Sequence, residues 1–195
     1  MESIAFDKEE RYQVKLKTSK GLLWVGMASI VMVFIGLTSA YIVRQEEGQW
    51  LVFDLPMMFG LSTLFILLSS ATMVWAVRSA KANNNNGVKT GLLLTLLLGV
   101  MFAISQFMAW QELVEMGVFF AGKESNASGS YLYVISGLHL AHLVVGILSL
   151  IYTFARSTQR AYNSERKLGL EVCALYWHFL DALWVYLFLF LFYIR

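Results

Sequence analysis

Cysteine, proline and charged residues are all scarce in this 195-residue sequence, and each scarcity narrows the possible classes of protein. Cys173 is the only cysteine, which rules out a disulfide within the chain and any zinc or iron–sulfur site built on several cysteines. Only 14% of the residues are charged, and a net charge of +2 gives no reason to expect a nucleic-acid partner. The first 20 residues are polar and lack the apolar core of a secretory signal peptide, so we expect no cleaved leader.

Apolar residues, in contrast, make up 58% of the chain, whereas a soluble domain has about 45–50%. They gather into five long runs, each near the length of about 20 residues that crosses a bilayer. Because backbone groups in lipid must hydrogen-bond within their own segment, each run is predicted to be a helix. The predicted helices are residues 21–43, 57–77, 90–110, 131–155 and 172–194. The sequence therefore predicts an all-α, polytopic membrane protein: a five-helix bundle in a single membrane domain (21–195) after a charged tail (1–20).

The links between the runs are short and polar. Residues 78–89 contain four consecutive asparagines followed by Gly87, and we expect a solvated turn there. Residues 113–130 end in KESNASGS, a composition typical of a flexible loop. With links this short, consecutive helices are expected to pack antiparallel in one bundle.

Basic residues are distributed unevenly between the two ends of the predicted bundle. Twelve of the 15 lie in the amino-terminal tail, in 78–89 and in 156–167. Only Arg44, Lys123 and Arg195 lie on the opposite side. The positive-inside rule then predicts a cytoplasmic amino terminus and an external carboxyl terminus.

Ionisable residues inside the predicted spans are few and are confined to two helices. The last span carries His178 and Asp181, three residues apart on one helix face. The fourth span carries His139 and His142 with the same spacing. Such residues are costly in a bilayer, so they are expected to face protein, water or lipid headgroups and not acyl chains.

Three interpretations of these residues compete. A membrane cytochrome could hold one haem on facing histidines, but His178 and His142 lie at depths of ~9 Å and ~20 Å from the cytoplasmic ends of their helices. A transporter could relay protons through Asp181, but the spans lack mid-helix proline and show no inverted repeat. A structural membrane subunit would use the same residues to bond its helices to one another and to a partner. Because the histidines lie at unequal depths and the transporter signals are missing, the residues favour this third interpretation.

Two motifs in the last two spans resemble subunit III of the haem–copper respiratory oxidases, which comprise cytochrome c and quinol oxidases. The fourth span has the pattern G-x-H-x-x-H-x-x-x-G followed by an arginine, and the fifth has E-x-x-x-x-Y-W-H-F-x-D-x-x-W. The matching residues are Gly137, His139, His142, Gly146, Arg156, Glu171, Tyr176, Trp177, His178, Phe179, Asp181 and Trp184. Looser matches at Tyr41 and at Gln106, Trp110 and Glu112 extend the resemblance over residues 20–195.

This resemblance implies a non-catalytic accessory subunit of a proton-pumping terminal oxidase in a bacterial plasma membrane. Such a subunit holds no haem or metal of its own, contacts subunit I, which carries the haems and copper, and joins subunit II and other respiratory subunits. It supports assembly, proton uptake and lasting activity. The chain matches the five-helix form and lacks the first two helices of longer members, which wall a phospholipid-binding cleft. It also has Ile30 after Ser29, where the family often has a buried glutamate.

The resemblance and the helix spacing together predict structural or contact roles for eight residues. We expect His178 and Asp181 to form a hydrogen-bonded pair, and Trp177 and Trp184 to pack on a neighbouring helix or lipid. We expect His139 and His142 to bond across to other helices. Arg156 is placed to hold the phosphate of a bound phospholipid, and Glu112 to make a contact at the end of the third span. Plain bundle packing is the alternative for each.

Overall fold

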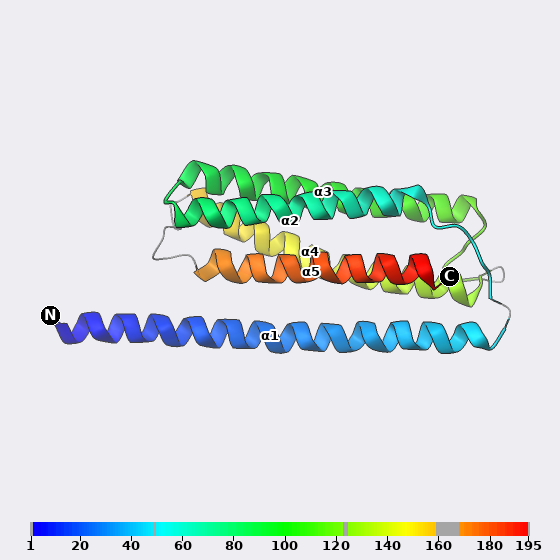
Figure 1. Cartoon of the computed structure of the whole chain (residues 1–195), viewed down its shortest axis with the longest axis horizontal. Helices are drawn as coiled ribbons and strands as arrows, with labels where there is room; N and C mark the ends of the chain where they lie inside the picture. Colours follow the sequence, from blue (N-terminus) through cyan, green and yellow to red (C-terminus); the bar gives the residue numbers. More distant parts are fainter. Residues whose placement is uncertain (1, 49, 123–124, 159–167, 195) are drawn as a thin grey trace.

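The computed structural model describes residues 2–48, 50–122, 125–158 and 168–194, and in these residues the helices are joined by links that contain no β-strand. The helices are α1 (Glu2–Glu46), α2 (Met57–Lys81), α3 (Asn85–Glu115), α4 (Ala127–Thr158) and α5 (Leu168–Tyr193). Each contains a segment long and apolar enough to cross a membrane, and in α1 that segment is Lys17–Glu46. The predicted all-α, five-helix architecture is therefore confirmed (Figure 1).

The amino-terminal tail is not separate from the first span but continues it as one helix. At 45 residues, α1 is about 67 Å long, roughly twice the thickness of a bilayer's hydrocarbon core. Figure 1 shows its amino-terminal end extending past the ends of the other helices. The first turns of α1 therefore project beyond the membrane-spanning bundle.

The turn between α2 and α3 is shorter than the predicted 78–89. It consists of residues 82–84, and Asn83 there takes a left-handed backbone conformation with φ of 55°. The Asn84 side chain accepts a hydrogen bond from the Gly87 backbone N–H at 3.1 Å and so caps α3. A Cβ at Gly87 would lie 2.6 Å from the Ser79 hydroxyl oxygen. The asparagines and glycine therefore build a tight helical hairpin, in which Gly87 is buried and not solvated.

The loop between α3 and α4 is also shorter than predicted. The third helix continues to Glu115, and the fourth begins at Ala127, four residues before the predicted start. Local capping explains the early start, because the Asn126 side-chain oxygen accepts hydrogen bonds from the backbone N–H and the hydroxyl of Ser128.

Helix α5 packs against three of the other four helices. It contacts α1, α2 and α4, whereas α1 packs only on α4 and α5 among the described helices. In Figure 1, α5 runs between α1 and the α2–α3 hairpin. The two largest fully buried side chains of the described residues, Trp177 and Trp184, both belong to α5. The last helix therefore joins the α2–α3 hairpin to α1 and α4 and supplies the largest side chains of the core.

Candidate functional site

The buried face of α5 presents Trp177, Asp181 and Trp184 at spacings of four and three residues. Both tryptophans are fully buried, and Asp181 is 3% exposed. Residues at these spacings lie above one another on one side of a helix, so all three point into the bundle together. His178 lies at the edge of this face, half-buried.

Trp177 is inserted between three helices. Its indole Nε1 donates a hydrogen bond to the Ser69 hydroxyl of α2 at 3.0 Å. Its ring lies against Gly99 of α3 and Gly146 of α4, where an added Cβ would come within 2.7 Å and 3.3 Å of ring atoms. The glycines therefore provide the space into which the ring fits.

Trp184 repeats this arrangement two turns further along α5. Its Nε1 donates to the Thr63 hydroxyl of α2 at 3.0 Å. Its ring stacks on Phe59 and meets the edge of Phe102, with ring centroids 6.1 Å and 5.0 Å away. Both tryptophans thus donate a hydrogen bond from the indole N–H to a hydroxyl of α2, and both pack their rings on the surrounding helices.

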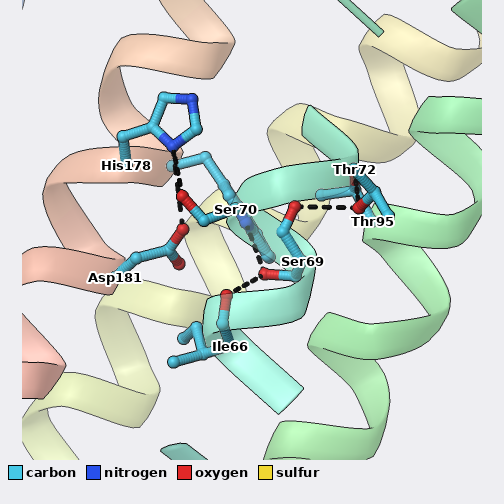
Figure 2. A network of polar contacts seen from close by, with 8 residues as sticks. Ile66, Ser69, Ser70, Thr72, Thr95, His178 and Asp181 are labelled. Atoms are coloured by element: carbon cyan, nitrogen blue, oxygen red, sulfur yellow. Dashed lines mark hydrogen bonds and ion pairs between the residues drawn. The ribbon is translucent and has the colours of Figure 1, made fainter. Parts of the chain in front are cut away.

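His178 and Asp181 do not form the direct hydrogen bond expected from their spacing. Figure 2 shows the Ser70 hydroxyl of α2 beside the histidine ring, 2.7 Å from Nδ1. The nearest carboxylate oxygen of Asp181 is 3.9 Å from the same nitrogen, which is too long for a hydrogen bond. The short aspartate side chain turns into the bundle while the ring stays at its edge, so Ser70 takes the histidine's bond.

The two histidines of α4 also differ from expectation, because neither ring bonds to a side chain of another helix among the described residues. His139 is fully buried, with its ring 5.0 Å from Trp184 and 5.9 Å from Phe102 between centroids, and neither ring nitrogen has a hydrogen-bond partner there. The Nδ1 of His142 lies 2.8 Å from the carbonyl of Leu138 in its own helix. Their contacts to other helices are ring packing, since aromatic side chains surround them.

The remaining predicted residues lie away from this centre. Arg156 is exposed in the last turn of α4 and makes no ion pair with a described residue. Glu112 is half-buried one turn before the end of α3. Within the described ranges, no three His, Cys, Asp or Glu side chains gather as metal ligands. The sequence positions Lys123 and 159–167, used to predict orientation, lie outside the described residues.

Sequence reasoning missed the hydroxyl side chains of α2 that receive the bonds from α5. Thr63 and Ser70 are seven residues apart, as are Ser62 and Ser69, and each has a bonding partner on α3 or α5. Ser62 accepts a bond from the Gln106 amide of α3 at 2.8 Å. The seven-residue repeat of paired hydroxyls matches the seven-residue separation of the two tryptophans. That correspondence was visible in the sequence and could have indicated that α2 faces α5.

Comparison with known proteins identifies the family to which this bundle belongs. A family model described as cytochrome c oxidase subunit III matches residues 50–195, which is most of the chain. The chain belongs to the cytochrome c oxidase subunit III family. The resemblance drawn from the motifs of the last two helices is thereby confirmed, and neither the stand-alone transporter nor the single-haem cytochrome is supported.

Relatives of this cytochrome c oxidase subunit III chain come from distant organisms. A probable cytochrome c oxidase subunit 3 of Rickettsia felis is 30% identical over 197 residues, covering 87% of this chain and 68% of that protein. A probable cytochrome c oxidase subunit 3 of Mycobacterium leprae is 29% identical and covers 88% of this chain and 85% of that protein. The cytochrome c oxidase subunit 3 of Loxodonta africana is 32% identical over 132 residues, covering 66% of this chain and 47% of that protein.

Family membership and the five apolar helices together make this chain a multi-pass membrane protein and one subunit of an oxidase complex.

Proposed function

We propose that the chain is the non-catalytic subunit III of a proton-pumping haem–copper oxidase, which reduces oxygen to water in a bacterial plasma membrane. In this proposal it contacts subunit I, which carries the haems and copper, and joins subunit II in the complex. Its own residues hold neither haem nor metal. Its work is to support assembly, proton uptake and the lasting activity of subunit I.

One observation carries this proposal: the α5 side chains that resemble a functional motif are directed at this chain's own helices. Trp177 and Trp184 bond to α2, and their rings pack on α3 and α4. Side chains bonded in this way hold four helices in one arrangement and leave the outer faces of the bundle to meet other subunits. Side chains that bond the helices of one chain together in this way suit an accessory subunit.

The outer faces are suited to lipid and to neighbouring membrane subunits. Large apolar side chains such as Met32, Leu67 and Leu148 are at least 49% exposed. Helix α1 is the least enclosed, with only 17% of its spanning window buried. Arg156, exposed at the end of α4, remains our candidate for holding a lipid phosphate by charge-assisted hydrogen bonds.

Purification tests the proposal directly. The full chain carrying an affinity tag is extracted in mild detergent, and its visible spectrum and copurifying subunits are recorded. We expect a haem–copper subunit to copurify and the complex to show haem absorption bands. The chain separated from that subunit should then be colourless. A haem spectrum in the isolated chain, or purification with no oxidase subunit, would contradict the proposal.

A further inference from the structure

Three residues in the interior of the bundle carry polar side-chain atoms that bond to no other described residue. They are Gln106 of α3, His139 of α4 and Asp181 of α5, and each residue is at most 3% exposed. The atoms are Oε1 of Gln106, both ring nitrogens of His139 and both carboxyl oxygens of Asp181. A buried polar atom without a hydrogen bond raises the free energy of the fold, so these atoms need a partner that the helices do not supply.

Ring packing places the three side chains around one point of the core. The His139 ring lies 5.0 Å from Trp184 of α5 and 5.9 Å from Phe102 of α3, measured between ring centroids. On α5, Asp181 precedes Trp184 by three residues on the same buried face. On α3, Gln106 follows Phe102 by four residues on its buried face. Helices α3 and α5 run in the same direction (Figure 1), so Asp181 and Gln106 lie on opposite sides of His139 along the bundle axis.

The chemistry of these side chains requires a molecule that both donates and accepts hydrogen bonds. A neutral imidazole has one donor nitrogen and one acceptor nitrogen. The Gln106 amide N–H donates to the Ser62 hydroxyl at 2.8 Å, which leaves its Oε1 as an acceptor. That oxygen and the acceptor nitrogen of His139 cannot bond to each other, because neither supplies a hydrogen. Asp181 likewise accepts through at least one oxygen in either protonation state.

Water meets this requirement with one molecule on each side of the histidine ring. A water between His139 and Asp181 accepts the ring N–H and donates to a carboxyl oxygen. A water between His139 and Gln106 donates one hydrogen to the acceptor nitrogen and the other to Oε1. Buried waters in globular proteins join otherwise unsatisfied groups in this way. A metal ion fits less well, because no three His, Cys, Asp or Glu side chains gather in the described ranges.

We propose that the core of the bundle contains an internal hydration site, in which ordered water joins Asp181, His139 and Gln106 and so connects α5, α4 and α3. The site accounts for two residues of the sequence motifs, His139 and Asp181, whose polar atoms bond directly to no described residue. It lies inside this chain and needs no residue of another subunit, so it is independent of the proposed function.

A density map of the purified oxidase complex, at a resolution that shows ordered water, tests the site directly. We expect water density at about 2.7–3.2 Å from a His139 nitrogen and from an oxygen of Asp181 or Gln106. A map in which His139 bonds Asp181 directly, or in which protein atoms alone fill the space between the three side chains, would overturn the proposal. A peak with the coordination of a metal ion would overturn it as well.

A double-mutant cycle tests whether the shared water couples His139 to Gln106. H139F keeps an aromatic ring but removes both nitrogens, and Q106L removes the amide. Each single variant leaves the other residue with an unbonded atom, so H139F/Q106L should lower the melting temperature by less than the sum of the two single changes. The matched control is H142F with Q106L, because the His142 Nδ1 lies 2.8 Å from the Leu138 carbonyl of its own helix. This control pair should be additive.

The possible results of the cycle are decisive in both directions. Additive changes for H139F and Q106L, or equal non-additivity in the control pair, would contradict a shared water. If H139F does not assemble, the density map of Q106L decides the outcome. In that map the water between His139 and residue 106 should be lost while the water beside Asp181 remains, and unchanged water at both positions would refute the site.

Discussion

At the scale of single residues, many buried polar side chains bond either to a side chain of a neighbouring helix or to a carbonyl of their own helix. The tryptophan N–H groups of α5 reach hydroxyls of α2 at 3.0 Å. Asp181 and His139, in contrast, have no hydrogen-bond partner for their buried side-chain atoms among the described residues. Because an unbonded polar group in a membrane interior is costly, these two residues are where a role beyond packing is best sought.

The exchange of Asp181 for alanine tests that role. We expect D181A to lower the yield of assembled complex or to shorten its active lifetime during turnover, because the space beside Ser70 is left empty. The haem spectrum per assembled complex should be unchanged, since Asp181 holds no cofactor in our proposal. D181N, which keeps the shape of the side chain, is the matched control and should assemble better than D181A. Loss of a haem band in normally assembled D181A would contradict the structural role.

The bond between Trp184 and Thr63 can be measured with a double-mutant cycle. W184F removes the N–H but keeps a ring, and T63V removes the hydroxyl at nearly constant volume. We expect a coupling free energy of about 0.6 kcal/mol, and at most ~1.7 kcal/mol, from unfolding in detergent. Strictly additive effects of the two substitutions would show that the 3.0 Å contact does not stabilise the protein.

At the scale of helices, small residues set how closely neighbouring elements approach. Gly91 of α3 meets Ala76 of α2 so closely that an added Cβ would lie 2.8 Å from the alanine Cβ and 3.0 Å from its backbone. Backbone atoms cannot move aside as a flexible side chain can. The close pairing of α2 and α3 therefore depends on glycine at this position.

Substitution of Gly91 by alanine should separate the two helices. We expect G91A to lower the free energy of unfolding by about 1–3 kcal/mol, the usual cost of overpacking, with a matching fall in melting temperature in detergent. G60A is the control, because nothing lies within 4 Å of a Cβ added at Gly60 on α2. If G91A proved as stable as G60A, the close contact between α2 and α3 would not be important for stability.

At the scale of the whole molecule, basic residues gather at the end of the bundle where α1 begins and where α2 turns into α3. The α2–α3 turn lies at the same end of the bundle as the amino terminus of α1, as Figure 1 shows. Arg78 and Lys81 end α2 there, and Lys89 begins α3. Positive charge near one end of a membrane bundle favours the cytoplasmic side, so the long extension of α1 is expected in the cytoplasm.

Reporter fusions test this orientation. Alkaline phosphatase fused after Arg195 should be active, because the carboxyl terminus is predicted to be outside. Green fluorescent protein fused after Asn84, in the α2–α3 turn, should fluoresce in the cytoplasm. The opposite pattern at both sites would reverse the predicted orientation.

The sequence by itself determined the helical class, the five spans and the family. Runs of apolar residues near 20 in length leave the backbone no other structure in lipid, whatever their neighbours are. The motifs around His139 and Asp181 were specific enough to indicate subunit III, and the matching family model confirms it. These properties depend on which residues follow one another within a segment, and this can be read from the sequence without the fold.

The tertiary structure alone decided which atoms meet. From spacing, His178 was expected to bond to Asp181, yet Ser70 of another helix takes that bond. Gly99 gave no signal in the sequence, but it makes room for the ring of Trp177. Each buried face could in principle pack on several helices, and only the rotation and depth of all five together select one partner. Polar contacts over 2.7–3.0 Å are sensitive to that choice, whereas the existence of a helix is not.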